Sequence, residues 1–213
     1  LAAERNSYRR FNFDILLANP PFAGDIKQSD MLSPYELAHK VGKDGSQGRL
    51  ETAVGRDLLF IERNLDFLRP GGRMAVVLPQ GRFNNYSDKR VREFIAERCR
   101  ILAVVGLHPN TFKPHTGTKT SVLFVQKWNE DPLAGPLCPK TDDYNIFFAT
   151  QQKPSKDNRG DKIYVTDPEG YLLRDDHGHW VVEHDLFNHE GLTRDGIAEA
   201  FELFAKKEGL SFF

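Results

Sequence analysis

The chain has 213 residues, of which 39% are hydrophobic, and its 29 Lys and Arg against 30 Asp and Glu give a net charge of -1. These values predict an ordinary globular protein of one domain or slightly more, large enough for a real core, and exclude one that holds nucleic acid by bulk positive charge alone. No apolar run approaches the roughly 20 residues that span a bilayer and no export signal opens the chain, so a cytoplasmic location is predicted.

Three short apolar runs without polar alternation are typical of strands buried on both faces of a parallel sheet. They cover residues 15–18, 74–78 and 101–107. Two amphipathic helices are predicted between them. The first carries Leu58, Ile61, Leu65 and Leu68 on one stripe and ends at the breaker Arg69-Pro70-Gly71-Gly72. The second begins at Ser87 as N-cap and buries Val91, Phe94, Ile95 and Cys99.

A fourth apolar run, residues 121–125, follows the third after a loop too short for a crossover helix. It is therefore predicted to run antiparallel to its neighbour, near the edge of a mixed α/β sheet.

The remaining segments carry weaker signals. Residues 23–55 are polar and without periodicity, which predicts a loop of more than 30 residues. Beyond Trp128, strands are predicted at 145–149 and 163–165, a turn at "DPEG", and a final amphipathic helix marked by Ile197, Phe201 and Phe204. No internal repeat is predicted.

The sequence "FDILLANPPFAG" runs from a buried strand into Asn19, Pro20, Pro21 and Phe22. Open α/β sheets bind ligands at the carboxyl ends of their strands, so these residues are the expected site. Two prolines fix φ twice and remove two N–H donors. The Asn19 side-chain oxygen and the Pro20 carbonyl could then accept both hydrogens of an exocyclic amino group, while Phe22 offers a face on which a planar base stacks.

Chemically, these acceptors would assist transfer of a methyl group to that nitrogen. The lone pair of an aryl amine is delocalised into its ring, and two acceptors would draw the nitrogen toward a pyramidal geometry and stabilise the positive charge that develops as it attacks an electrophilic methyl. The alternative interpretation is a plain turn that ends a strand, with Phe22 in the core.

Three blocks together resemble one family: "FDILLANPPF", "FLRPGGRMAVVLPQGRF" and "GTKTSVLFVQK". Over roughly residues 11–128 the chain is similar to class I, S-adenosylmethionine-dependent adenine-N6 DNA methyltransferases, specifically the modification subunit of type I restriction-modification systems. The resemblance implies the C-terminal half of a Rossmann-like sheet, catalysis by Asn19, Pro20, Pro21 and Phe22, and an adenine flipped out of DNA. It also implies a specificity subunit and a restriction subunit as partners.

The chain departs from that family in one respect. Such enzymes bind S-adenosylmethionine through a glycine-rich turn and an acidic residue upstream of the Asn-Pro-Pro block, and these are missing here. "GKDGSQG", at 42–48, is no substitute, since no strand is predicted before it and no helix after it. We therefore expect a partial catalytic domain at 1–128 and an extension at 129–213 that could dock a partner. Beyond Asn19, cofactor binding should be weak or absent, and the isolated chain should be inactive. It should also self-associate through an exposed strand edge.

Two further groups are candidates for binding. On the resemblance, the loop carrying Lys113, His115, Thr116, Thr118 and Lys119 lies where DNA runs, so phosphate contacts are expected there. His177 and His179 would share one strand face, yet their spacing matches no common metal site and a solvated turn is favoured; no metal is predicted. Neither Cys99 nor Cys138 suggests a disulfide.

Two other functions stay open at this point. An Asn-Pro-Pro-Phe corner also suits methylation of guanine N2 in ribosomal RNA or of a protein glutamine, since each substrate is a planar amino group. The chain could alternatively be a non-catalytic assembly module that docks a specificity subunit.

Overall fold

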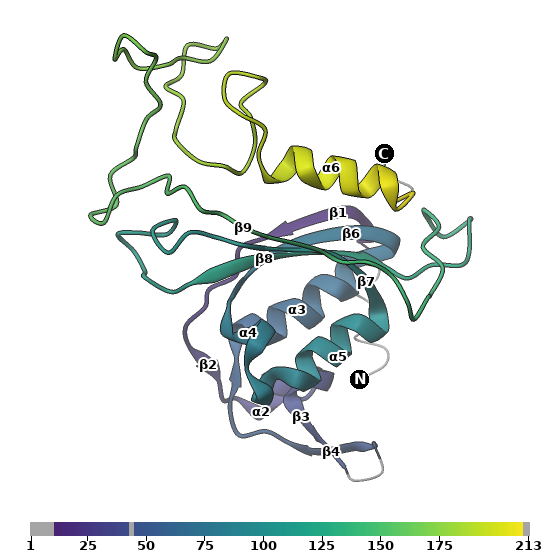
Figure 1. The fold of residues 1–213 in the computed structure, drawn as a ribbon. Coiled ribbons are helices and arrows are strands. Elements are labelled where there is room, and N and C mark those ends of the chain that lie inside the picture. Colours follow the sequence, from purple (N-terminus) through teal and green to yellow (C-terminus); the bar gives the residue numbers. More distant parts are fainter. Residues whose placement is uncertain (1–10, 43–44, 211–213) are drawn as a thin grey trace. The chain divides into compact units, whose positions relative to one another are not determined.

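The structure, a computed structural model, describes residues 11–42 and 45–210 (Figure 1). The chain divides into two compact units, Leu1–Leu102 with Leu123–Tyr144 and Ala103–Val122 with Asn145–Phe213.

A mixed sheet of five strands organises the fold. In chain order these are β1 (Phe13–Ala18), β6 (Leu68–Pro79), β7 (Cys99–Gly106), β8 (Thr120–Lys127) and β9 (Phe147–Thr150). Their order in the sheet is β1-β6-β8-β7-β9, with the β1–β6 and β7–β9 pairs parallel. The connection from β7 to its sheet neighbour β8 is short, and the two strands run antiparallel, so the predicted mixed α/β sheet is confirmed. The predicted place of the antiparallel strand near the edge was wrong, because β8 inserts between β6 and β7 and is the central strand.

In the first unit, helix α3 (Arg56–Phe67) packs against β6 on the face of the sheet that α5 also covers (Figure 1). Ile61 and Leu65 are buried as the periodicity predicted. The helix ends one residue before Leu68, which is buried as the first residue of β6 rather than as part of the helical stripe. The predicted breaker therefore lies inside a long strand.

The segment after β6 contains α4 (Gly81–Asn84), the 3-10 helix η2 (Tyr86–Asp88) and α5 (Lys89–Arg98). Val91, Phe94 and Ile95 are buried on α5, as predicted. The predicted N-cap was wrong: Ser87 lies within η2, because η2 adds a turn before the helix begins after Asp88.

The prediction of an unstructured loop at 23–55 was also wrong, because the segment folds as an insertion against α3. Its elements are β2 (Asp25–Ile26), α2 (Ser29–Leu32), η1 (Glu36–Ala38), β3 (His39–Val41), β4 (Gln47–Leu50) and β5 (Val54–Gly55). Leu32, Ala38 and Val54 form a small core with Leu59 of α3. Burial against a neighbouring helix, rather than periodicity, holds these short elements.

Polar contacts anchor the insertion to its neighbours. The Glu62 carboxylate of α3, only 2% exposed, accepts the backbone N–H groups of Glu36 and Leu37, each at 2.8 Å. From α5, the Arg98 guanidinium pairs with the Glu36 carboxylate at 2.9 Å. These contacts satisfy the first turn of η1, whose N–H groups have no partner within the helix.

In the second unit, helix α6 (Ile197–Lys207) packs on β9 through three aromatic rings. The Phe147 ring lies 5.5 Å, centroid to centroid, from both Phe201 and Phe204. The predicted final helix and the predicted strand near 145–149 are thereby confirmed. The strand predicted at 163–165 forms only an isolated bridge, between Tyr164 and Val182.

Three turns of the second unit share one pattern, although the sequence predicted no internal repeat. Asp157, Asp167 and Asp175 each begin an Asp-x-x-Gly turn whose fourth residue is a glycine at positive φ. In each turn the aspartate N–H donates to the carbonyl of the residue four positions on, at 2.9 Å, and the aspartate carboxylate accepts that residue's N–H. The carboxylate holds the turn closed, as in other Asx turns.

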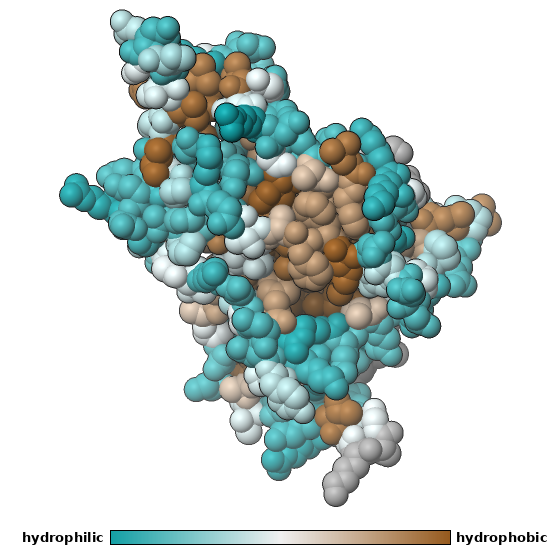
Figure 2. Space-filling model, in the orientation of Figure 1, coloured by the Kyte–Doolittle hydropathy of each residue, from teal (hydrophilic) through white to brown (hydrophobic). Residues whose placement is uncertain are grey.

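The surface drawn in Figure 2 is mostly hydrophilic, with apolar residues gathered in patches. Within residues 11–42 and 45–210, no helix has both the length and the apolar character needed to cross a membrane. Cys99 and Cys138 are both free and buried, and burial raises the pKa of Cys99 to about 12 and of Cys138 to about 11.

Candidate functional site

Residues Asn19–Phe22 form a corner at the carboxyl end of β1. The last paired residue of the strand, Ala18, faces Val76 of the parallel strand β6, so the corner leaves the sheet beside the end of β6 at Pro79. Asn19 is exposed, and its side-chain amide makes no hydrogen bond within residues 11–42 and 45–210. An open amide at this edge of the sheet is available to a ligand.

The other residues of the corner differ in exposure. Pro20 is buried, Pro21 is exposed and Phe22 is half-buried. The two prolines leave Asn19 without neighbouring N–H donors on its carboxyl side, so carbonyl and amide oxygens dominate the corner. Such a set favours a ligand that donates hydrogen bonds, such as an amino group.

The chain is fixed again shortly after the corner. Gly24 adopts a φ of 96°, which L side chains rarely adopt, and a Cβ there would lie 3.3 Å from Nε of Arg56. The Arg56 N–H donates to the Gly24 carbonyl at 3.1 Å, and Asp25 then pairs with Gly55. The corner is thus held between β1 and the start of α3, which limits the positions that Asn19 and Phe22 can take.

A buried ion triad stands at the same edge of the first unit. Arg82, just after β6, donates to both carboxylate oxygens of Asp57 at 2.7 and 3.0 Å and to Asp88 at 2.8 Å. Asp57 is 1% exposed. Gly55 is required beside it, because a Cβ there would lie 2.8 Å from Oδ1 of Asp57. The triad ties the first turn of α3 to the segment that follows β6.

The electrostatics of the triad favour the charged state of Arg82. Burial works against the guanidinium charge, but the hydrogen bonds and negative charges of Asp57 and Asp88 outweigh it, so the pKa of Arg82 is raised above its ordinary value. Asp57 also lies in the first turn of α3, where the helix dipole favours a negative charge.

The predicted phosphate-contacting residues lie in the second unit, in the loop between β7 and β8. Lys113 and Thr116 are half-buried, while His115, Thr118 and Lys119 are exposed. The Thr116 and Thr118 hydroxyls share a hydrogen bond of 2.9 Å, and Lys156 donates to the Lys113 carbonyl at 2.9 Å. The loop therefore presents hydroxyl and ammonium groups on a braced backbone.

The histidines considered for a metal lie in a turn. His177 and His179 flank Gly178 in the third Asp-x-x-Gly turn, so the predicted shared strand face was wrong, because the Asp175 carboxylate folds this segment back on itself. Within the described part of the chain, no group of three or more His, Cys, Asp or Glu side chains is arranged to hold a metal ion.

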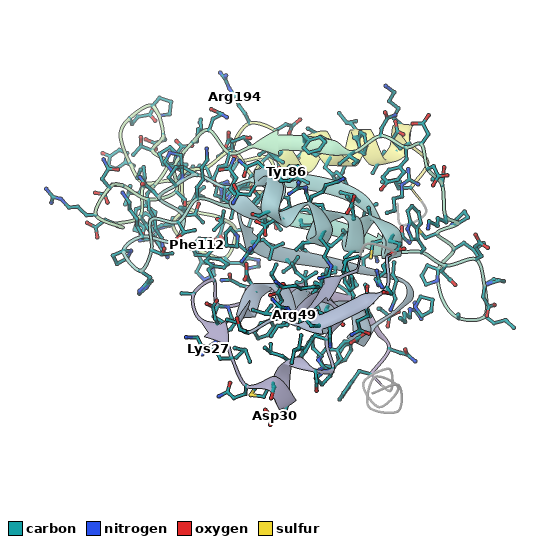
Figure 3. All side chains as sticks on the ribbon, turned by 90° about the horizontal axis from the view of Figure 1, so that it is seen from below. Lys27, Asp30, Arg49, Tyr86, Phe112 and Arg194 are labelled. Atoms are coloured by element: carbon teal, nitrogen blue, oxygen red, sulfur yellow. The ribbon has the colours of Figure 1, made fainter. Side chains whose placement is uncertain are left out.

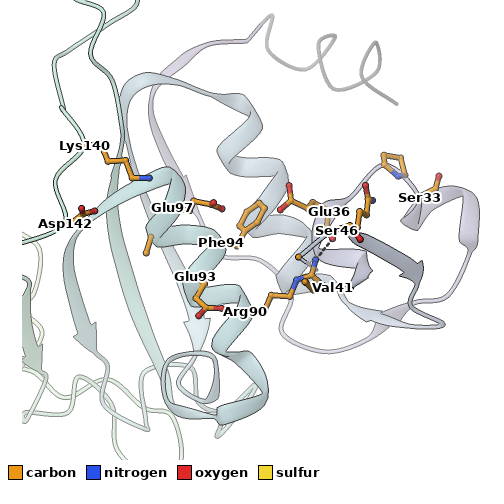
Figure 4. A pocket seen from close by; sticks show the side chains of 14 residues that line it. Ser33, Glu36, Val41, Ser46, Arg90, Glu93, Phe94, Glu97, Lys140 and Asp142 are labelled. Atoms are coloured by element: carbon orange, nitrogen blue, oxygen red, sulfur yellow. Dashed lines mark hydrogen bonds between the residues drawn. The ribbon is translucent and has the colours of Figure 1, made fainter. Parts of the chain in front are cut away.

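A cavity of about 840 Å³ lies between the insertion and α5 (Figure 4). Its charged groups hold the two parts together: the Arg90 guanidinium donates to the backbone carbonyls of Glu36, at 2.8 Å, and of His39. Four carboxylates, those of Glu36, Glu93, Glu97 and Asp142, also line it, and none of the corner residues does. We regard it as the junction of the insertion with α5.

The described residues lack the main cradle that S-adenosylmethionine requires. The turn that leaves β1 contains prolines instead of the glycine N–H groups that hold an anionic group. The glycine-containing stretch at 42–48, of which residues 43 and 44 lie outside the described part, follows β3 and leads into the antiparallel strand β4. A strand does precede it, contrary to prediction, but no helix opens on it.

Sequence reasoning missed the Arg82 triad. Arg82 and Asp57 are 25 residues apart, and nothing in the periodicity of either segment marks them as partners. The signal was Asp57 itself, a charged residue near the buried stripe of a predicted amphipathic helix, since buried carboxylates need a partner.

Comparisons with known proteins agree on one family. The family model described as "N-6 DNA Methylase" matches residues 3–169. The methylase subunit of the type I restriction enzyme EcoEI from Escherichia coli is 31% identical over 116 residues, which are 54% of this chain and 21% of that protein. The EcoKI methylase subunit of Escherichia coli K12 is 28% identical over 179 residues, 78% of this chain and 30% of that protein.

One solved structure gives the fold. A Listeria monocytogenes protein described as a class I S-adenosylmethionine-dependent methyltransferase aligns with a TM-score of 0.50 and 21% identity, over 64% of this chain and 36% of that chain. The chain thus spans less than a third of the length of the two curated relatives, and its sheet has the class I methyltransferase arrangement.

Proposed function

Because this chain belongs to the N-6 DNA methylase family, we propose that it forms the amino-group site of an adenine-N6 DNA methyltransferase of type I restriction-modification systems. The observation that carries the proposal is the Asn19 corner at the carboxyl end of a parallel strand. Its amide is exposed, makes no hydrogen bond among the described residues and is followed by two prolines. Similarity to two type I methylase subunits supports DNA adenine as the substrate class.

The corner would act on the adenine amino group. The Asn19 side-chain oxygen and the Pro20 carbonyl accept its two hydrogens, which localises the nitrogen lone pair and stabilises the positive charge that develops there. Phe22, half-buried and therefore restricted in motion, stacks on the base. When bound, S-adenosylmethionine supplies an electrophilic methyl group.

Cofactor binding by this chain alone is proposed to be weak. Asn19 is the one described residue that we assign to the cofactor, because the turn after β1 lacks the N–H groups of a glycine-rich cradle. Titration calorimetry of the chain with S-adenosylmethionine should detect little heat, and micromolar binding would contradict this part of the proposal.

The other assignments concern DNA and partners. Lys113, Thr116, Thr118 and Lys119 would contact phosphates from the braced loop after β7. Specificity and restriction subunits are the expected partners, with residues 129–213 as a docking region, and the reaction would take place on DNA in the cytoplasm.

The test measures transfer of labelled methyl groups to unmethylated DNA by the native protein, isolated with the subunits that accompany it. Asn19→Ala should reduce the turnover at least a hundredfold, since a preorganised acceptor contributes on the order of 10²-fold or more, and should leave DNA binding intact. Asn145→Ala is the matched control, because Asn145 is exposed and, among the described residues, its side chain bonds only Glu208, the residue that follows α6.

The same assay separates the rival functions. Ribosomal RNA and a glutamine-containing release factor are offered as competing acceptors, and preferential methylation of either would refute the adenine assignment. Full methylation of DNA by Asn19→Ala would instead favour an assembly role for this chain.

A further inference from the structure

A short turn after β6 displays one aromatic ring to solvent. Tyr86, labelled in Figure 3, is 89% exposed and begins η2. It stands in contrast to Phe83, three residues earlier, which is half-buried. An aromatic side chain held almost wholly in water is free to contact a ligand, and its planar ring can stack on a base.

The backbone that carries Tyr86 is braced on both sides. The Asn85 N–H donates to the Gly81 carbonyl at 2.9 Å, and the Asn85 carbonyl accepts from Arg92 at 2.8 Å. On the other side, Asp88 is buried and paired with Arg82 at 2.8 Å. The exposed ring thus sits on a fixed support, so ordering it on contact with a ligand loses little backbone freedom.

The turn lies at the edge of the first unit that carries the amino-group site. β1 and β6 are parallel, so Asn19 follows the end of one strand while Gly81 follows the end of the other. Both segments leave the sheet at its carboxyl edge, where open α/β sheets bind their ligands.

The chemistry around the ring suits nucleic acid. Four neighbours, Asn84, Asn85, Ser87 and Lys89, are exposed and uncharged or positive. The one acidic residue between Gln80 and Lys89 is Asp88, which is buried and paired with the Arg82 guanidinium that it shares with Asp57. The turn therefore shows an aromatic face, amides, a hydroxyl and an ammonium group, that of Lys89, which pairs with the exposed Glu93 of α5 at 3.3 Å. Groups of these kinds contact bases and phosphates in other proteins.

We propose that Tyr86 stacks on an unstacked DNA base beside the target adenine, with the Asn84–Lys89 turn against the neighbouring backbone. This inference rests on the proposed function. Extraction of an adenine breaks base stacking at the target position, and a rigid aromatic ring next to that position would recover part of the lost stacking energy.

The test measures the affinity for unmethylated duplex DNA by fluorescence anisotropy. It compares wild type, Tyr86→Ala and Tyr86→Phe, each as the native protein isolated with its accompanying subunits. Tyr86→Ala should weaken DNA binding by roughly tenfold to a hundredfold, the range typical of one lost base–aromatic stack. Tyr86→Phe should bind like wild type, since stacking needs the ring and not the hydroxyl. S-Adenosylmethionine affinity should be unchanged in both variants.

Leu133→Ala is the matched control. Leu133 is 95% exposed in the segment that reaches the opposite end of β6, where the Pro136 carbonyl abuts Gly71. Its removal should leave DNA affinity unchanged. Because Tyr86 is so exposed, its truncation opens no cavity, and circular dichroism should show an unaltered fold.

The inference is overturned if Tyr86→Ala binds DNA with wild-type affinity, or if Tyr86→Ala and Tyr86→Phe lose equal DNA affinity. It is also overturned if Tyr86→Ala loses the accompanying subunits while its DNA affinity is unchanged, because the ring would then be a protein contact. Failure of the proposed function looks different. In that case the wild-type protein methylates no DNA, or Asn19→Ala methylates normally, whatever happens at position 86.

Discussion

At the scale of single residues, the Arg82 triad is the most consequential contact of the first unit. Replacing Arg82 by Met would leave the Asp57 carboxylate, 1% exposed, without its partner. Removal of one member of a buried ion pair is strongly destabilising, and we expect the free energy of unfolding to fall by about 3 kcal/mol. Urea unfolding of the chain, followed by circular dichroism, measures this loss.

A conservative variant and a control variant test whether the lost ion pair causes this fall in the free energy of unfolding. Arg82→Lys should recover only part of the loss, because an ammonium group cannot reproduce the two-pronged bond to Asp57. Lys89→Met removes an exposed pair with Glu93 and should change the free energy of unfolding by less than about 0.5 kcal/mol. Equal effects of Arg82→Met and Lys89→Met would show that the triad contributes no special stability.

The sequence reveals residues whose chemistry is local. The stiffness of Pro20-Pro21 and the missing donors follow from covalent structure alone, so the corner could be predicted before its surroundings were known. Two other features depend on segments far apart in the chain: the exposure of the Asn19 amide and the contact of Arg82 with Asp57. Pairings of this kind are set by the tertiary fold and leave no periodic signal.

At the scale of elements, the insertion depends on one buried carboxylate. Glu62→Gln keeps the shape of the side chain but replaces one of the two oxygens that accept the Glu36 and Leu37 N–H groups with a donor. One buried N–H then loses its acceptor, which should lower the free energy of unfolding by about 1–3 kcal/mol.

Hydrogen exchange locates the effect of Glu62→Gln. The amides of Glu36 and Leu37 should exchange faster in the variant, while amides of β6 keep their protection. Glu51→Gln is the control, since within the described ranges the Glu51 carboxylate forms only a half-exposed pair with Lys40 at 3.7 Å. Uniform acceleration across the unit would argue that Glu62 supports the whole core and not the insertion in particular.

A second element-scale prediction concerns pH. The rings of His184 and His189 stack at 4.4 Å, and burial together with the charge of His189 lowers the pKa of His184 below its ordinary 6.5. The unfolded chain therefore binds a proton at higher pH than the folded chain. This contribution to stability is present above about pH 6.5 and is lost as the pH falls through the lowered pKa.

His184→Gln removes the titrating group, so its urea midpoint should fall less than that of the wild type when the pH is lowered from neutral to acidic values. His177→Gln, at an exposed turn position, serves as the control and should follow the wild-type profile. Parallel profiles for wild type and His184→Gln would contradict the assignment.

Elements were predictable where they were long. Helices α3 and α5 complete several turns, so their apolar stripes were legible in the sequence. The strands and helices of residues 23–55 have two to four residues each, too few for any period to show, and are held by Leu32, Ala38 and Val54 against α3. The three Asp-x-x-Gly turns share a sequence pattern, but their spacing is irregular, so they form no repeat of fixed period.

At the scale of the whole molecule, the mixed sheet ends at β1 with apolar side chains in water. Phe13, Ile15 and Leu17 alternate along the strand and are 44%, 56% and 78% exposed. Alternate residues share one face of a strand, so these three form an apolar stripe along a strand that pairs only with β6 among the described strands. Edges of this kind favour pairing between chains.

We expect the isolated chain to self-associate through this stripe, and Leu17→Lys to reduce the association. A charge at Leu17 faces solvent in the monomer and would have to be buried in the associated form, where it lacks a partner. Sedimentation velocity over a range of concentrations measures the shift toward monomer. Leu133→Lys adds the same charge at a position 95% exposed on a loop, and should leave the association unchanged. A wild-type chain that sediments as a monomer at every concentration would show that the stripe does not pair. Equal effects of Leu17→Lys and Leu133→Lys would assign any change in association to net charge.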